Sequence, residues 1–505
     1  MGPGIATGAR RSGSTSWKLD PAIAPQTQGI IVSPFSSLDA AEALFLSLEN
    51  TATGAWLQAL RGELDISDAT DEKGERTANA AIAFTWSGLK LMGLAEQALA
   101  SFSVPFRQGM HQPDRQRRLG DTAGAATVIP GGPRWSGNNL PPAEGIAGTP
   151  LTVHVVLLLY ATDDTALDTR LLSLVPRLSQ HGLRVVHQRR LCLMSDKEGK
   201  IREHFNFVDG MSQPVLHGQW IRPPSGPAGE LRLRWHGIEA GEVLLGHINA
   251  HEEPAPGPVV ASSPVAARLL SADGVSEGLR NLGLHGSYLV IRELYQDVAA
   301  FWNSMQQAAN ALGAGITADW VAERAVGRTQ EGVLLRPAGT PAVPPGVADN
   351  DAGFDQLDRY GLGCPLGSHI RRGNPRDSLP SRDGPVEGLL QASNAHRILR
   401  RGRTFGPKLE DRLQDDGEIR GLLFMCLNSD IARQFEFVQQ AWMLNPGFAT
   451  LIQETDPIMG PRGRFTIPAL PVRRCPVVET FVRFAGGEYF FLPSLPALEY
   501  LATLP

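Results

Sequence analysis

The order of strand-like and helix-like segments between residues 28 and 193 restricts this chain to few folds. Residues 38–49 and 165–178 carry apolar side chains at the spacing of amphipathic helices. Apolar or β-branched runs predict strands over residues 28–32, 80–86, 151–160 and 183–193. In chain order the elements are strand, helix, strand, strand, helix and strand. This order predicts a ferredoxin-like unit.

A break in composition follows this unit. Residues 222–229 and 252–259 are rich in Pro and Gly, which is typical of a connection between domains. Beyond it the strand and helix pattern returns, and the expected strands and helices cover residues 286–294, 296–312, 420–427 and 430–444. We therefore expect a disordered tail over residues 1–26, a first domain over 27–221 and a second domain over 222–505.

The composition is that of an ordinary globular protein, and it excludes several classes of function. The chain has 505 residues, of which 42% are hydrophobic and 20% charged, with a formal net charge of -5. Because a basic excess is missing, we expect no nucleic-acid partner. The four cysteines lie far apart without a CxxC pair, which suits a reducing cytosol. We found no signal peptide or long apolar run, so we expect a cytoplasmic protein with no membrane partner.

Asp209 is the most informative acidic residue. It follows the apolar residues Phe205, Phe207 and Val208 and precedes Gly210. A carboxylate at the end of a buried strand is usually paired or functional. The structural alternative is an Asx turn, in which Asp209 caps its own backbone.

His369 lies in a polar segment broken by Gly and Pro, close to Arg371 and Arg372. A lone histidine is more often a surface or hydrogen-bonded residue. The two arginines nevertheless suit a metal-ligating imidazole that lies beside anionic carboxylates. Cys364, earlier in the same segment, is the rival ligand as a thiolate.

Arg400 and Arg401 follow an apolar pair, and on a strand their side chains point to opposite faces. We expect Arg400 to face a pocket and Arg401 to face out. Asp430 opens the helix over residues 430–444. It either interacts with the N-terminus of that helix or accepts a hydrogen bond from the ring of His369.

Three motifs together resemble the dye-decolorizing peroxidase family. The distal motif Gly-x-x-Asp-Gly matches residues 206–210, with Asn206 in place of the first glycine. Asn is the residue other than Gly that most readily takes a positive φ, so the turn can survive this change. The Cys-Pro-x-x-x-His-Ile-Arg segment contains His369, and the Arg-Arg-Gly-x-x-Phe-Gly segment contains Arg400. The resemblance extends from about residue 28 to the end of the chain.

The resemblance implies an α+β fold of two ferredoxin-like halves, with haem b in the C-terminal half. His369 is then the proximal iron ligand, Asp430 its hydrogen-bond partner, and Arg371 and Arg372 contact the haem propionates. Asp209 would move the proton of hydrogen peroxide while Arg400 stabilises the developing negative charge. A ferryl intermediate would then oxidise a small reducing substrate such as a dye or phenol.

The alternative function is a haem-binding protein for storage, sensing or iron release, with incidental peroxidase activity. The presence of both Asp209 and Arg400 argues against a purely passive pocket. A homo-oligomer is compatible with the sequence.

Overall fold

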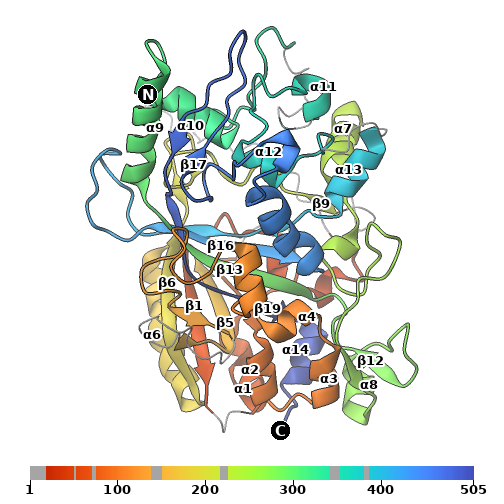
Figure 1. Ribbon diagram of the computed structural model, residues 1–505. Helices are drawn as coiled ribbons and strands as arrows, with labels where there is room; N and C mark the ends of the chain where they lie inside the picture. The colour runs from red at the N-terminus through yellow and green to blue at the C-terminus, as the bar shows by residue number, and fades with distance from the viewer. Residues whose placement is uncertain are drawn as a thin grey trace, which may run out of the picture.

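The computed structural model describes residues 19–49, 53–70, 76–137, 151–216, 226–341, 350, 353–379 and 386–505. Figure 1 shows two sheets at the centre of the molecule, with helices above and below them. Of the predicted tail, residues 1–18 lie outside the described residues. The prediction is wrong for residues 19–26, because Leu19 and Ala24 are buried in the apolar core. The domain boundary predicted after residue 221 falls in 217–225, also outside the described residues.

The first sheet has the strand order β2-β5-β1-β6, and its neighbouring strands are antiparallel. Its strands are β1 (Ala40–Leu48), β2 (Ala78–Phe84), β5 (Val155–Ala161) and β6 (Leu183–Cys192). The helices α1 (Ala55–Leu64) and α6 (Asp164–Gln180) connect β1 to β2 and β5 to β6. This topology confirms the predicted ferredoxin-like unit.

Two of the predicted elements in this unit are wrong. Residues 38–49 form the strand β1 instead of a helix, and residues 28–32 contain a short 3-10 helix, Gly29–Ile31. Both faces of β1 are buried: Leu44 packs in one core cluster and Phe45 in another. A strand that is apolar on both faces lacks the alternation that separates strands from helices in a sequence.

The second sheet repeats the first, with the order β19-β13-β16 followed by the short strands β14 and β15. Its strands are β13 (Ser287–Gln296), β14 (Leu399–Arg400), β15 (Arg403–Phe405), β16 (Gly421–Asn428) and β19 (Val482–Leu492). Its main helical segments are α9 (Val298–Leu312), α10 (Ala318–Val326), and the π-helical η4 (Ala432–Glu436) and η5 (Val438–Met443). The prediction of an α+β fold with two ferredoxin-like halves is confirmed.

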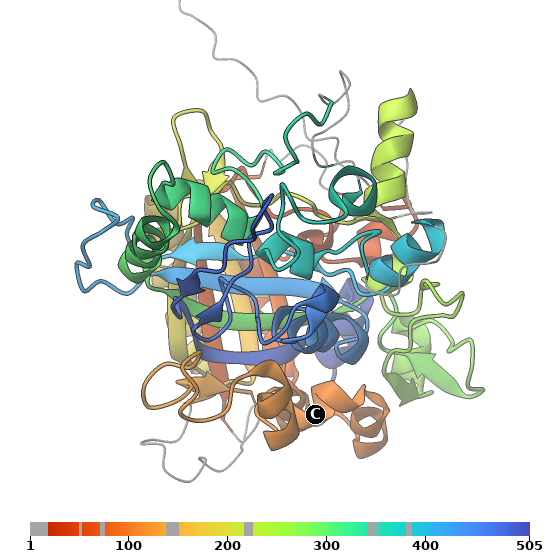
Figure 2. The same ribbon diagram turned by 45° about the horizontal axis from the view of Figure 1, so that its top comes forward.

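The two sheets join into one closed, nine-stranded sheet. Phe84 of β2 pairs with Phe491 of β19, and Cys192 of β6 pairs with Thr404 of β15. β13 pairs with both β16 and β19, which completes the ring. Figure 2 shows the strands of one half crossing those of the other.

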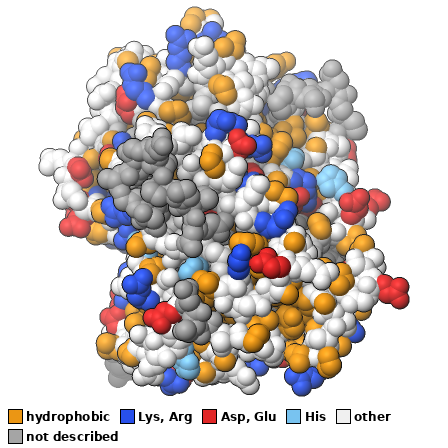
Figure 3. Space-filling model, turned by 60° about the horizontal axis from the view of Figure 1, so that its bottom comes forward, with side chains coloured by type: hydrophobic (Ala, Val, Ile, Leu, Met, Phe, Trp, Pro, Cys, Tyr) orange, Lys and Arg blue, Asp and Glu red, His pale blue; other side chains and the backbone are white. Residues whose placement is uncertain are grey.

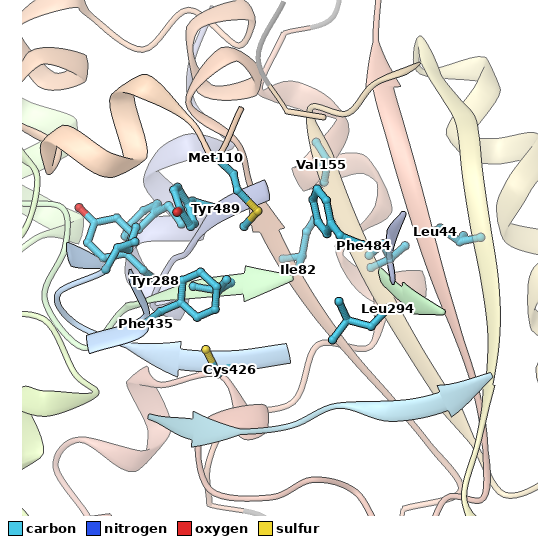
Figure 4. Close-up of a cluster of buried hydrophobic side chains, with 14 of the residues drawn as sticks. Leu44, Ile82, Met110, Val155, Tyr288, Leu294, Cys426, Phe435, Phe484 and Tyr489 are labelled. Atoms are coloured by element: carbon cyan, nitrogen blue, oxygen red, sulfur yellow. The ribbon is translucent and has the colours of Figure 1, made fainter. Parts of the chain in front are cut away.

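Apolar side chains pack on both sides of the closed sheet. Phe45, Ile291 and Phe490 belong to one core cluster, which both halves share. Leu44, Ile82 and Leu294 belong to another, which also includes residues of the surrounding helices (Figure 4). Both halves therefore contribute to the same cores.

The remaining elements lie in the connections and around the edges. Between β2 and β5 these are α2 (Trp86–Leu91), α3 (Glu96–Ser101), α4 (Val104–Gln108), α5 (Pro113–Leu119), β3 (Trp135–Ser136) and β4 (Leu151–Thr152). Between β6 and β13 they are β7 (Met194–Ser195), β8 (Ile201–Arg202), β9 (Val215–Leu216), α7 (Gly226–His236), β10 (Gly237–Ile238), β11 (Val259–Ala261), α8 (Pro264–Leu269) and β12 (Leu279–Asn281). Later elements are α11 (Phe354–Asp358), α12 (His369–Gly373), α13 (Val386–Asn394), β17 (Gly463–Arg464), β18 (Val477–Val478) and α14 (Leu495–Leu501).

The surface carries charges of both signs. On the face shown in Figure 3, Lys and Arg side chains are interspersed with Asp and Glu side chains. Across the described ranges, each helix is too short or too polar to cross a membrane.

Gly421 tests the close pairing of β13 and β16. A Cβ at Gly421 would lie 2.0 Å from the carbonyl oxygen of Leu294. Gly421→Ala must therefore push the paired strands apart, and we expect it to lower the free energy of unfolding by about 1–3 kcal/mol. Denaturation in urea measures this change.

Gly62→Ala is the matched control, because Gly62 is exposed on α1 and a Cβ there would have no atom within 4 Å. We expect this substitution to raise the free energy of unfolding by about 0.5–1 kcal/mol. A similar response of the two variants would contradict the close pairing.

Candidate active site

A cavity of about 280 Å³ lies between the helix α12, the outer face of the second sheet and the turn that carries Asp209. Leu294 on β13 and Phe424 on β16 contribute to its floor, and Phe435 and Val438 cover it from η4 and η5. His369, Asp209 and Arg400 all line it. The three residues predicted to carry the chemistry are therefore brought together in one place.

His369 is the first residue of α12 and is held in place by a buried carboxylate. Its Nδ1 lies 3.0 Å from Oδ2 and 3.2 Å from Oδ1 of Asp456. Asp456 Oδ1 also accepts hydrogen bonds from the backbone N–H groups of Ile458 and Met459, at 2.9 and 2.8 Å. Burial opposes the charged imidazole, but Asp456 outweighs it and raises the pKa of His369. With Nδ1 engaged, Nε2 is the ring nitrogen left to face the cavity.

Asp430 is not the hydrogen-bond partner of His369, so this prediction is wrong. Its Oδ1 accepts a hydrogen bond from the backbone N–H of Arg433 at 3.0 Å, and its Oδ2 lies 3.7 Å from Nε of the same arginine. Asp430 thus caps a helical turn, which was the structural alternative. Sequence analysis missed Asp456 because no local spacing links it to His369.

Arg371 and Arg372 do not line the cavity, which corrects a second prediction. Both are fully buried and donate to backbone carbonyls. Nη1 of Arg371 binds the Asp358 and Cys364 carbonyls at 2.8 and 3.0 Å. Nη1 of Arg372 binds the Trp442 carbonyl at 2.6 Å, and its Nη2 binds the Glu454 carbonyl at 2.7 Å. The two arginines hold the loops around α12.

Other arginines line the cavity: Arg292, Arg328, Arg376, Arg397 and Arg400. Arg292 is paired with the buried Asp121 at 2.6 Å, so the positive charge comes from the others. Arg397 is only 4% exposed and donates to the neutral Ser212 carbonyl at 2.8 Å. Burial and the neighbouring Arg400 lower the pKa of Arg397 to about 9. Nη2 of Arg376 donates to Oδ1 of Asn350 at 2.8 Å, and Nη2 of Arg328 donates to the same oxygen. These side chains form a region suited to the anionic groups of a ligand.

Asp209 and Arg400 lie side by side, as predicted. Nη1 of Arg400 is 3.6 Å from Oδ1 of Asp209, and each side chain is 35% exposed. Nη2 of Arg400 also donates to the Met211 carbonyl at 2.7 Å, which fixes the guanidinium. Arg401 points to the other face and donates to the Ile30 and Ile31 carbonyls, so it is turned away from the cavity but buried.

The turn before Asp209 has the backbone geometry expected from its motif. Asn206 has φ 76° and Gly210 has φ 79°. Asn206 therefore takes the positive φ that a glycine would take. Its Cβ adds a steric cost in this conformation that a glycine would not have. Oδ1 of Asp209 accepts the Gly210 N–H at 2.6 Å, so a local capping bond coexists with exposure to the cavity.

Glu203 is a cavity residue that sequence analysis did not single out. Its Oε1 accepts the Phe207 N–H at 2.9 Å, and its Oε2 accepts the Phe205 N–H at 2.9 Å. Gln296 Nε2 donates to Oε2 at 2.8 Å. Burial nevertheless raises the pKa of Glu203 to about 7. The available signal in the sequence was that Glu203 lies at the start of the same short apolar stretch that Asp209 ends.

Comparisons with known proteins identify relatives of the chain and similar folds. No model of a known protein family matches the sequence. The multifunctional dye peroxidase DyP2 of Amycolatopsis sp. is 30% identical over 372 residues, which cover 69% of this chain and 71% of that protein. The DyP-type peroxidase of Anabaena sp. has a similar fold, with a TM-score of 0.71 at 22% identity over 97% of this chain and all of that one.

A second solved structure has a similar fold. It is a dye-decolorizing peroxidase in complex with 2,6-dimethoxyphenol, with a TM-score of 0.68 at 22% identity over 95% of this chain and 99% of that one. The fold is that of the DyP-type peroxidases, and the relative at 30% identity shows that the chain is a peroxidase, an oxidoreductase that acts on hydrogen peroxide. The chain belongs to the dye-decolorizing peroxidase family.

Glu203 predicts a pH dependence of stability. The pKa of Glu203 rises from 4.5 to about 7 in the folded protein, so between these values the unfolded state has lost a proton that the folded state keeps. The contribution of Glu203 to stability is therefore complete below pH 4.5 and is lost as the pH rises to about 7. Glu203→Gln should remove this trend, as measured by urea denaturation across that range.

Glu198→Gln provides the control, because Glu198 is exposed on a neighbouring turn. It should leave the pH dependence of wild type unchanged. Parallel stability curves for wild type and Glu203→Gln would show that Glu203 does not titrate in this way.

Proposed function

We propose that this protein is a haem b-dependent peroxidase that reduces hydrogen peroxide and oxidises dyes, phenols or similar one-electron donors. One observation carries the proposal: an imidazole backed by a buried carboxylate shares a cavity with a carboxylate and guanidinium pair. The names of the relatives and the phenol complex of a structural neighbour support the donor class.

The cavity fits a planar, apolar cofactor that carries anionic groups. Its walls include Phe354, Ile370, Phe424, Phe435 and Ile458. Nδ2 and Oδ1 of Asn374 are buried on the lining without a hydrogen-bond partner among the described residues, which is costly unless a ligand engages them.

His369 Nε2 would ligate the haem iron, and Arg328, Arg376 and Arg397 would bind the propionates. Bound haem would supply the redox chemistry, by accepting oxidising equivalents from peroxide and passing them to the donor one at a time. Asp456 would orient the imidazole of His369 and strengthen it as a ligand, because it accepts the Nδ1 proton.

Asp209 and Arg400 would act on hydrogen peroxide itself. Asp209 would accept a proton from one peroxide oxygen and return it to the other, which leaves as water. Arg400 stays charged in a partly desolvated site and would stabilise the negative charge that develops as the O–O bond breaks. The hydrogen bond from Arg400 to the Met211 carbonyl would hold the guanidinium in position for this role.

Substitutions at the three residues should separate their roles. Asp209→Asn keeps the shape of the side chain but removes the base, so we expect reaction with peroxide to slow by about 10²–10⁴-fold. Arg400→Leu should slow it by about 10²–10³-fold. Both variants should retain the haem absorption spectrum, whereas His369→Ala should lose haem. Stopped-flow mixing with peroxide and the Soret absorption measure these effects.

Glu63→Gln, on the exposed surface of α1, should behave as wild type in both measurements. If Asp209→Asn reacted with peroxide at the wild-type rate while retaining haem, the roles proposed here would be wrong. The cavity would then suit a storage or sensing protein better.

Asp456 and Asp430 form a matched pair of carboxylates, of which only Asp456 contacts His369. Asp456→Asn should change the absorption spectrum of the haem protein and weaken haem binding by about 10–100-fold. Asp430→Asn should leave both unchanged. Haem titration followed by absorption distinguishes the two, and identical spectra for both variants would contradict the role of Asp456.

A further inference from the structure

The turn that carries Asp209 is held from the other half of the chain by residues 327–334, which we name the 327–334 segment. This segment follows α10 and folds back on itself. Thr329 N–H donates to the Val333 carbonyl at 2.9 Å, and Gly332 N–H donates to the Thr329 carbonyl at 2.9 Å. Arg328, at its start, lines the cavity.

Gln330 makes two direct polar contacts between this segment and the turn, and Nη1 of Arg202 also donates to the carbonyls of Asn206 and Gln330, at 3.0 and 2.8 Å. Nδ2 of Asn206 donates to Oε1 of Gln330 at 2.7 Å, and the Val208 N–H donates to the Gln330 carbonyl at 3.1 Å. Nε2 of Gln330 in turn donates to Oδ1 of Asp319 on α10, at 2.7 Å. Asp319 therefore holds the Nε2 end of the Gln330 amide, while its Oε1 end meets Asn206.

The packing of the segment links both sides of the cavity. A Cβ at Gly332 would lie 2.6 Å from Sδ of Met211 and 3.4 Å from Cβ of Val208, two residues that flank Asp209. A Cβ at Gly327 would lie 2.5 Å from Cγ1 of Ile370, the residue after His369. The backbone of one short segment therefore touches the neighbours of both Asp209 and His369.

We propose that the 327–334 segment sets the position of Asp209 relative to His369, and that the amide bridge between Gln330 and Asn206 is the contact through which it does so. Gln330 is then a positioning residue for the base. This proposal rests on the proposed function of Asp209.

The rate of proton transfer depends on the position of the base, so a contact that fixes Asp209 would affect the reaction. A displacement of about 1 Å in a catalytic group can cost about 10²-fold in rate. Asp209 lies on a turn with positive φ at both Asn206 and Gly210, outside the paired strands of the two sheets. The glycine that the family motif has in place of Asn206 could not form the bridge, so the bridge belongs to this chain rather than to the motif.

Three variants of the holoprotein test the bridge: Asn206→Gly, which keeps the positive φ, Gln330→Met, which keeps the length of the side chain, and the double variant. We expect each single variant to react with peroxide about 10-fold more slowly, and the double variant to react no more slowly than either single one. The Soret spectrum should be unchanged. Hydrogen exchange of the backbone amides of residues 204–210 should be faster in each variant, and this readout does not depend on activity.

Two further comparisons separate positioning from general destabilisation. Val333→Thr, half exposed on the same segment, should match wild type in rate and exchange. In an Asp209→Asn background, Gln330→Met should cause no further loss of rate, because the base through which it acts is absent.

The outcomes distinguish this proposal from the proposed function. Wild-type rates in Asn206→Gly and Gln330→Met would overturn the positioning role, and so would additive losses in the double variant or a further loss in the Asp209→Asn background. If Asp209→Asn is slow in that case, the proposed function still stands. If Asp209→Asn itself reacts at the wild-type rate, the proposed function fails first.

Discussion

The two sheets are paired at their edges in two places, and the pairing of Cys192 with Thr404 is the one that joins the chain segments leading to Asp209 and Arg400. It joins β6 of the first half to β15 of the second half. The chain that leaves β6 leads to Asp209, and β14, next to β15, carries Arg400. Because the edges of the two sheets are joined here, a carboxylate from one half and a guanidinium from the other lie 3.6 Å apart. The cavity is thus a product of how the halves join.

The charges around the cavity follow one physical rule: buried charged groups are stabilised by fixed partners. Arg371 and Arg372 donate to backbone carbonyls and thereby hold the loops around α12. Asp456 is held by two backbone N–H groups and by His369. Asp209 and Arg400, which line the cavity, are each 35% exposed and lie 3.6 Å apart. The charged groups around the cavity therefore differ in burial and in partners more than in residue type.

Sequence analysis predicted part of this site and missed the rest for a consistent reason. It identified Asp209, His369 and Arg400 because each lies in a short motif whose Gly, Pro and Arg neighbours carry local information. It assigned to Asp430 the contact with His369 that Asp456 makes. It placed Arg371 and Arg372 at the cavity, which Arg328, Arg376 and Arg397 line instead. It also placed a helix where β1 lies, since a strand buried on both faces has no alternating pattern.

The sequence by itself indicated the ferredoxin-like unit, although with its first strand and first helix misplaced, and it determined the three motif residues of the site and the ability of Asn206 to take a positive φ. These properties depend on neighbouring residues, because the spacing of apolar side chains and the steric limits on φ involve only a few consecutive residues. Only the tertiary structure decided which carboxylate holds His369, which arginines face the cavity, and that Gln330 bridges to Asn206. Such contacts join residues that are far apart in the chain, and a hydrogen bond depends on distance and angle in space rather than on separation in sequence.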